Sequence, residues 1–193
     1  DVPFEIARAP ITIRNLLTHT SGFTYNPLVL GLGDVAYQYA ELEVMSQKIS
    51  LEENLEMLAQ IPLVAQPGAS FNYSVSVDVL GAVIEKVTGQ RLGDYLDEIF
   101  FKPMGMTDTA FRVRPEARNR FARFYEPESL RNPAAPIPGS EIEWHIVETA
   151  PFGLPYDGWG QAPTFDSGGG GMYSTAQDFL KYAEMVANCG VLN

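Results

Sequence analysis

The sequence predicts a mainly α-helical chain of the α+β class, with short strands and loops confined to about residues 112–165. Two observations predict this class. Helix-capping residues precede apolar side chains at helical spacing in residues 1–111 and again after residue 174. The intervening segment has no regular period and is rich in arginine and proline.

Length and composition indicate how many packed domains the chain can form and which classes of partner it disfavours. With 193 residues, 46% of them hydrophobic, the chain has enough apolar material for one packed domain. A net charge of −11 repels phosphate backbones, so we expect no nucleic-acid partner. Its apolar runs are far shorter than the ~20 residues of a membrane-spanning helix. The single cysteine, Cys189, excludes an internal disulfide.

Three helices are predicted before residue 62. Thr12 is placed to cap a short helix that ends before Ser21 and Gly22. A second helix is expected from Asp34 to about Ser46. The sequence SLEE at 50–53 has the pattern of a capping box for a third helix, which Pro62 must end.

Two further helices follow a turn at 66–69 and an extended segment at 70–73. One helix runs from about Ser76 to Gly89, and the next runs from about Leu92 to Phe100, before Pro103. The spacing of apolar residues in the first of these helices predicts a buried face, formed by Val77, Leu80, Val83, Ile84 and Val87.

The last third of the chain combines charge, proline and glycine. Residues 112–131 hold six Arg and three Glu, which we expect to form a solvated face paired with neighbouring acids, and a proline-rich run follows at 132–139. After the glycines at 168–171, the sequence STAQ at 174–177 suggests a second capping box. The final helix is expected to bury Phe179, Leu180, Tyr182, Ala183, Met185 and Val186.

Several kinds of chemistry have no motif here. The two histidines, His19 and His145, lie 126 positions apart without a second cysteine, so we expect no metal site and no cofactor. The glycine run lacks the lysine of a phosphate-binding loop. Neither Gly-x-Ser-x-Gly nor Ser-x-x-Lys occurs anywhere in the chain. A lone histidine such as His19 is expected to be structural.

Four blocks of sequence nevertheless resemble one enzyme family. Residues 11–22 read ITIRNLLTHTSG, residues 67–74 read PGASFNYS, and residues 167–176 read SGGGGMYSTA. Between them, LG at 80–81, VTG at 87–89 and PMGMTDT at 103–109 form the remaining block. Together they resemble the class C β-lactamase-like serine hydrolases, which include β-lactamases, DD-peptidases, carboxylesterases and transesterases. The resemblance implies the helical domain of the β-lactamase and penicillin-binding-protein fold.

The resemblance implies that Tyr73 is the catalytic tyrosine of a Tyr-x-Asn motif. A free phenol, with a pKa near ~10, is a poor base at neutral pH. Neighbouring lysine ammonium groups would favour its phenolate, which could then take a proton from the nucleophilic serine and pass it to the leaving group.

Val75 and the glycines at 168–171 are the residues that we expect to contact substrate. Val75 stands where the family has asparagine, a residue that contacts the substrate amide, so the resemblance favours the esterase-like branch over β-lactamases. Gly168, Gly169, Gly170 and Gly171 are expected to line the substrate cleft, where small residues allow close approach. A tight turn that requires positive φ is the alternative for these glycines.

The missing motifs shape the expected function. Ser-x-x-Lys and Lys-Thr-Gly, which the family carries in its α/β sheet domain, are absent, and the chain begins without Met. We therefore expect residues 1–193 to be a single helical domain of a larger serine hydrolase acting on a small ester or amide, inactive alone. The exposed sheet-facing surface is then expected to favour oligomerisation. A non-catalytic binding module and a purely structural domain are the alternatives.

Overall fold

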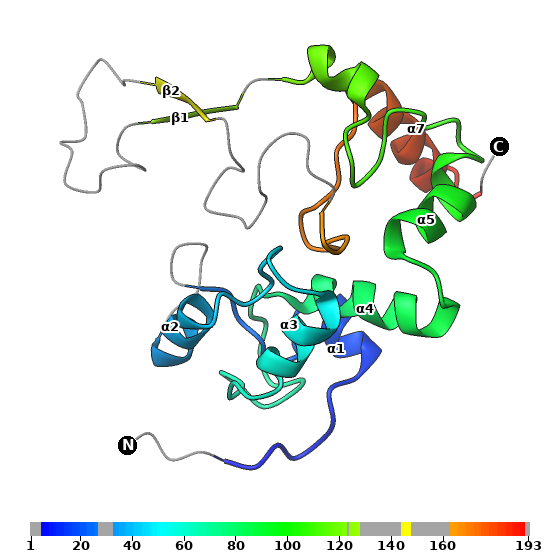
Figure 1. Cartoon of the computed structure of the whole chain (residues 1–193). Helices are drawn as coiled ribbons and strands as arrows, with labels where there is room; N and C mark the ends of the chain where they lie inside the picture. The colour runs from blue at the N-terminus through cyan, green and yellow to red at the C-terminus, as the bar shows by residue number, and fades with distance from the viewer. Residues whose placement is uncertain (1–4, 27–32, 123, 128–143, 148–162, 192–193) are drawn as a thin grey trace, which may run out of the picture.

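A computed structural model of the chain describes residues 5–26, 33–122, 124–127, 144–147 and 163–191. Helices α1 to α4 lie together in one part of the molecule, α5 and α7 lie in another, and strands β1 and β2 lie apart from both (Figure 1). The helices are α1 (Ile13–Leu17), α2 (Asp34–Glu41), α3 (Leu51–Leu58), α4 (Ser76–Thr88), α5 (Leu92–Leu96) and α7 (Ala176–Ala187).

Capping boxes start α1 and α3 at the predicted residues. Thr12 Oγ1 accepts a hydrogen bond from the N–H of Asn15, whose side chain accepts one from the N–H of Thr12. Ser50 and Glu53 exchange the same pair of bonds, at 3.2 and 2.8 Å. The hydrogen bonds from Ser50 lower the pKa of Glu53. Both helix starts are thus fixed by local polar contacts.

Helix α2 is shorter than predicted, because it ends at Glu41 rather than near Ser46. The backbone turns there, with left-handed φ angles of 48° at Glu43 and 64° at Met45. This turn places Met45 in the core, where only 6% of the residue is exposed. Burial of the methionine therefore prevails over the helical propensity of the segment.

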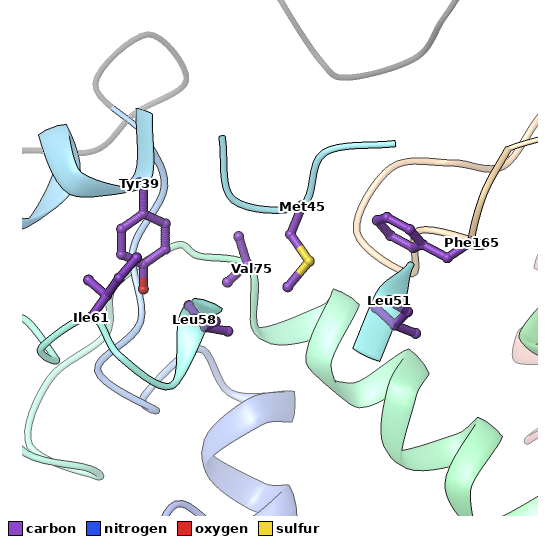
Figure 2. Packing of buried hydrophobic residues seen from close by; sticks show 7 residues of the cluster. All are labelled: Tyr39, Met45, Leu51, Leu58, Ile61, Val75 and Phe165. Atoms are coloured by element: carbon purple, nitrogen blue, oxygen red, sulfur yellow. The ribbon is translucent and has the colours of Figure 1, made fainter. Parts of the chain in front are cut away.

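The hydrophobic core joins α2, α3 and the start of α4 (Figure 2). Tyr39 reaches into it from α2, and its hydroxyl accepts a hydrogen bond from the N–H of Thr24 at 3.3 Å. Burial raises the pKa of Tyr39 to about 12. Phe165, far along the chain, packs into the same cluster, whose members are Tyr39, Met45, Leu51, Leu58, Ile61, Val75 and Phe165.

Helix α4 has the predicted bounds and ends at Gly89, which adopts a left-handed φ of 70°. Its predicted buried face is wrong in part, since Val87 is 80% exposed and the other four apolar residues are only half-buried. The fully buried positions are Ser76, Asp78 and Gly81 instead. Small and polar residues therefore carry the close contacts of this helix.

Helix α5 continues into one π-helical turn, Asp97–Phe101, so the predicted helix through Phe100 is present with a wider last turn. Leu92 and Phe101 from this element are buried, as are Met106 and Phe111 from the chain that follows. These four side chains lie outside the main core cluster, and Leu92 lies against Gly81 of α4.

The region expected to hold strands and loops contains a 3₁₀ helix, Pro115–Arg120, and two antiparallel strands. β1 (Phe124–Pro127) pairs with β2 (Trp144–Val147), with Phe124 opposite Val147. Arg114 and Arg120 both form ion pairs with Asp108, which confirms acidic partners for these two arginines. The proline-rich run at 132–139 lies outside the described residues.

Helix α7 differs most from its prediction. Thr175, not Ser174, caps it, and the Thr175 hydroxyl accepts a hydrogen bond from the N–H of Asp178 at 3.1 Å. Asp178 is its only buried residue, whereas Phe179 is 63% and Val186 is 55% exposed. The predicted burial of the α7 apolar side chains is therefore wrong in this chain, which offers that face no partner among the described residues.

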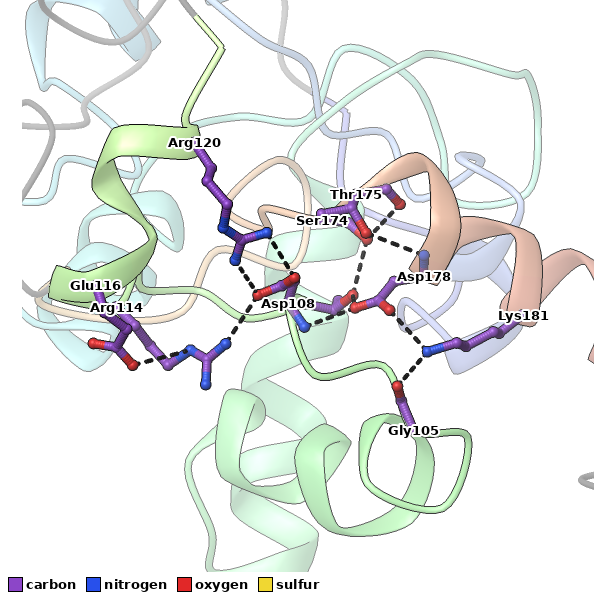
Figure 3. A network of polar contacts seen from close by, with 10 residues as sticks. Gly105, Asp108, Arg114, Glu116, Arg120, Ser174, Thr175, Asp178 and Lys181 are labelled. Atoms are coloured by element: carbon purple, nitrogen blue, oxygen red, sulfur yellow. Dashed lines mark hydrogen bonds and ion pairs between the residues drawn. The ribbon is translucent and has the colours of Figure 1, made fainter.

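Polar contacts hold the first turn of α7 instead (Figure 3). The Asp178 carboxylate accepts hydrogen bonds from the turn at 108–109, and Lys181 binds both Asp178 and the carbonyl oxygen of Gly105.

No helix among the described residues is long and apolar enough to cross a membrane.

Candidate active site

Tyr73 lies on a segment outside regular secondary structure, between the turn at 67–69 and the start of α4. Two backbone hydrogen bonds hold this segment beside residues 19–24. The N–H of Asn72 donates to the carbonyl of His19 at 2.8 Å, and that of Val75 donates to Thr24 at 3.4 Å. The first and second blocks of the family signature are therefore adjacent in space.

The ring of Tyr73 belongs to an aromatic cluster and is 45% exposed. The imidazole of His19 lies 4.9 Å from it, centroid to centroid, and the ring of Tyr25 lies 5.3 Å away. His19 also contacts the ring of Phe71 edge-on at 5.9 Å. Tyr73 is thus held by neighbouring rings while its surface remains open to a ligand.

Buried serine hydroxyls connect this cluster to α4. Ser74 Oγ lies 3.4 Å from His19 Nδ1 and 2.7 Å from Ser76 Oγ, which in turn lies 2.7 Å from Ser21 Oγ. All three serines are completely buried. Ser21 Oγ also accepts a hydrogen bond from the N–H of Phe23. The buried hydroxyls therefore satisfy one another, as buried polar groups must.

Val75, which we expected to face substrate, is only 2% exposed and lies in the main core. Figure 2 shows its side chain among those of the other core residues. Although Tyr73 and Val75 are only two residues apart, one is on the surface and the other is inside. The valine contributes packing at this position and presents no surface to a ligand.

The glycine-rich loop packs closely against the start of α4. A Cβ atom on Gly168 would lie 2.5 Å from the carbonyl oxygen of Val77, and one on Gly169 would lie 2.5 Å from Asp78 Oδ2. The glycines do form a turn, closed by a hydrogen bond of 3.0 Å from the N–H of Gly171 to the carbonyl of Ser167, but none of the four has a positive φ, so the expected left-handed backbone is absent from this turn. Close approach of backbone to helix explains the first two glycines.

Asp78 fastens this loop from inside. Its Oδ1 accepts hydrogen bonds from Ser167 Oγ at 2.5 Å and from the N–H of Gly169 at 3.1 Å. Burial raises the pKa of Asp78, and these hydrogen bonds oppose that rise. A Cβ on Gly169 would also lie 3.2 Å from the hydroxyl oxygen of Tyr25, so the loop reaches the aromatic cluster.

A groove of about 390 Å³ runs along the other side of the loop. Apolar side chains of α4 and α5 form its walls, and all four glycines at 168–171 line it. A larger hollow of about 740 Å³ lies near the Asp108 ion pairs and does not include Tyr73. The groove therefore adjoins the predicted glycines, but neither Tyr73 nor Val75 lines it.

The described residues contain no cluster of three side chains able to hold a metal ion. The polar side chains gathered at the site are the Tyr73 phenol, the imidazole of His19 and the buried serine hydroxyls. The apolar spacing of residues 77–87 predicts burial of a different face of α4 from the one that carries Asp78. The sequence signal for this face is Asp78, a charged residue within a largely apolar stretch and three positions before Gly81, so that the two share one side of the helix.

Comparison with known proteins places these features in a family. Residues 4–192 match the family model described as Beta-lactamase. The chain is 38% identical over 192 residues to Esterase EstB of Burkholderia gladioli, covering 94% of this chain and 46% of that protein. It is 29% identical to Lovastatin esterase of Penicillium rubens, covering 95% of this chain and 41% of that protein. The chain thus spans less than half the length of these relatives.

Solved structures agree with the sequence matches. EstCE1, described as a hydrolase with promiscuous acyltransferase activity, superposes with a TM-score of 0.71 at 30% identity, over 96% of this chain and 48% of that one. An LovD6 mutant of simvastatin synthase from Aspergillus terreus gives 0.67 at 27% identity, over 96% of this chain and 39% of that one. With a family model covering nearly every residue and relatives that share its fold, the chain belongs to the Beta-lactamase family.

Proposed function

We propose that this chain supplies the tyrosine-bearing part of the active site of a serine hydrolase that cleaves esters through an acyl-enzyme. The observation that carries the proposal is the placement of Tyr73. Its ring is half-exposed, packed between His19 and Tyr25, and connected through Tyr25 to the glycine-rich loop. Exposure leaves the phenol accessible to a substrate, while the contacts with His19 and Tyr25 hold the ring in place.

The proposed reaction passes an acyl group to a serine and then to water. The serine oxygen bonds to the acyl carbon, the C–O bond to the alcohol breaks, and Tyr73 moves the serine proton to the departing oxygen. In the second half, the oxygen of water bonds to the acyl carbon and the bond to the serine oxygen breaks. Tyr73 moves the proton of water to that serine oxygen, and the carboxylic acid is released. Because Ser-x-x-Lys is absent from residues 1–193, the nucleophile must come from other residues of the enzyme, and the chain alone is inactive.

An ester is the proposed substrate class for two reasons. Relatives that match over almost the whole chain are named esterases. In addition, the side chain two residues after Tyr73 is a buried valine, which has no polar atom to bind the amide of a β-lactam or peptide. Hydrolysis of esters needs no such contact.

Gly168, Gly169, Gly170 and Gly171 are proposed to line the path of the substrate. They form one wall of the 390 Å³ groove, whose other walls are apolar. Such a surface suits the hydrocarbon part of an acyl group or of an alcohol. The loop edge at Gly169 adjoins Tyr25 and so connects this groove to the catalytic surface.

The test uses a p-nitrophenyl ester and a chromogenic cephalosporin. In the complete hydrolase, Tyr73→Phe is expected to lower kcat for the ester by about 10²- to 10⁴-fold, because only the proton-transferring hydroxyl is removed. Tyr37→Phe, at an exposed tyrosine of α2, is the matched control. The isolated chain is expected to turn over neither compound.

Two outcomes would reject the proposal. A complete protein that binds esters but never hydrolyses them would support the non-catalytic binding module. Turnover by the isolated chain above that of its own Tyr73→Phe variant would show that residues 1–193 already hold a nucleophile.

A further inference from the structure

We infer that His19 is a positioning residue for Tyr73, acting through a ring contact whose geometry the buried serines fix. The inference rests on the proposed function, because it assigns His19 a role only if the Tyr73 phenol transfers protons. No motif gave His19 this role, and the sequence alone predicted a structural histidine.

The backbone at His19 adopts a conformation that side chains seldom take. Its φ is 51°, in the left-handed region, where residues other than glycine are uncommon. Hydrogen bonds on both sides hold it there, from the His19 N–H to Leu16 and from Asn72 to the His19 carbonyl. This turn, directly after α1, directs the imidazole toward the segment that carries Tyr73.

The imidazole contacts the aromatic side chains of that segment. Phe71 and Tyr73 are two residues apart, and the imidazole lies 5.9 Å from the first ring and 4.9 Å from the second. Among the described residues the Tyr73 hydroxyl forms no hydrogen bond, so ring packing by His19 and Tyr25 sets its direction. Movement of the imidazole would therefore move the phenol oxygen.

The buried serines give the imidazole of His19 a hydrogen-bonding partner on its inner side. Ser74 Oγ lies 3.4 Å from Nδ1, and either hydroxyl can be the donor between Ser74 and Ser76 and between Ser76 and Ser21. In one order, Ser21, which accepts from the N–H of Phe23, donates to Ser76, Ser76 donates to Ser74, and Ser74 donates to Nδ1, so that the ring proton is on Nε2. In either order the contact at Nδ1 holds the imidazole from the buried side.

Two substitutions separate the ring contact from the hydrogen bond. His19→Asn tolerates the left-handed φ and retains an oxygen close to the place of Nδ1, but it removes the ring beside Tyr73. His19→Phe retains a ring but removes the Nδ1 atom that contacts Ser74 Oγ, and it is strained at this φ. The two roles therefore predict opposite rankings of kcat. If His19 positions Tyr73, His19→Phe is the more active variant, and if His19 is only structural, His19→Asn is.

The experiment measures kcat, KM and Tm of these variants in the complete hydrolase with a p-nitrophenyl ester. For a positioning role, kcat of His19→Asn falls by about 10- to 100-fold with KM unchanged, while His19→Phe retains more of kcat despite its lower Tm. Thr18→Ala is the control and keeps wild-type kcat, because this exposed hydroxyl contacts the carbonyl of Arg14 and the hydroxyl of Thr20 and touches neither His19 nor Tyr73.

A kcat that follows Tm across both variants would overturn the inference, as would wild-type kcat in His19→Asn. If neither variant folds, contacts between the ring protons of His19 and Tyr73 in the wild-type protein decide by NMR, and their absence would also overturn it. Tyr73→Phe keeps the two proposals distinguishable. If that variant loses activity while the His19 variants do not, the proposed function stands and only the positioning role fails.

Discussion

The carboxylate of Asp178, in the first turn of α7, accepts a hydrogen bond of 2.8 Å from the backbone N–H of Asp108. Thr109 Oγ1 donates to the same carboxylate at 3.1 Å, and Lys181 pairs with it at 3.1 Å. Since Asp178 is the one buried residue of α7, this contact replaces the usual apolar attachment of a helix. The apolar side chains of α7 take almost no part in holding it.

Asp178→Ala is therefore expected to loosen α7 more than any apolar substitution in that helix. The change leaves the N–H of Asp108 without its acceptor, at a cost of about 1–3 kcal/mol, and leaves the hydroxyl of Thr109 with Ser174 as its remaining partner. Urea unfolding of the chain measures the loss in the free energy of unfolding. In hydrogen exchange, the substitution should speed the exchange of α7 amides relative to wild type and leave that of α3 amides unchanged.

Gln177→Ala, at the exposed preceding position, is the matched control and should change little. Equal effects of the two substitutions would mean that α7 is held by contacts other than the carboxylate of Asp178.

Asp78→Asn is expected to stabilise the chain increasingly as the pH rises. Burial raises the pKa of Asp78 above its unfolded value. The favourable contribution of the protonated carboxyl is thus complete below the unfolded pKa and is lost as pH rises through the folded pKa. Asparagine keeps an oxygen for Ser167 and Gly169, carries no charge and avoids this loss. Urea unfolding from pH 4 to pH 7 compares the two proteins.

Glu56→Gln, at an exposed glutamate of α3, supplies the control for a general charge effect in this acidic chain. Parallel curves of stability against pH for Asp78→Asn and wild type would show that Asp78 does not titrate differently in the folded chain.

Local patterns predicted the starts of α1 and α3 and the end of α4, but not the end of α2. The capping boxes at Thr12 and Ser50 and the left-handed Gly89 depend on neighbouring residues, which a sequence displays directly. The faces of α4 and α7 were predicted less well, because burial depends on what packs against a helix. Apolar spacing predicted burial for Val87 and Phe179, yet both are exposed here.

In the candidate site, too, the local motifs could be predicted from the sequence, whereas the contacts between distant residues could not. The family resemblance, which the family match confirms, was visible in the motifs around His19, Tyr73 and the glycine-rich loop. The hydrogen bonds that join these motifs were not visible, since Asp78 and Ser167 are 89 positions apart. Val75 was assigned to substrate from its motif position, although the backbone turns its side chain into the core.

Gly168→Ala should destabilise the loop, whereas Gly170→Ala should not. A Cβ on Gly168 would meet the carbonyl oxygen of Val77 at 2.5 Å, a backbone atom that cannot rotate away. The expected cost is about 1–3 kcal/mol, as for other overpacked sites. No atom lies within 4 Å of a Cβ on Gly170, which makes it a control within the same loop. Thermal unfolding measures both variants, and equal Tm values would show that the loop yields without cost.

The exposed face of α7 is expected to make the isolated chain self-associate. Phe179, Tyr182 and Val186 lie three and four residues apart, so they share one side of the helix, and each is at least 43% exposed. Two copies that cover this face remove apolar surface from water, which favours association. Sedimentation velocity of the chain should therefore show a sedimentation coefficient that increases with concentration. The double variant Phe179→Gln, Val186→Gln should remain monomeric, whereas Tyr37→Gln, which removes an equally exposed aromatic ring from α2, should associate as wild type does. If the double variant associates as strongly as the wild type, another surface joins the copies, and the face of α7 does not drive self-association.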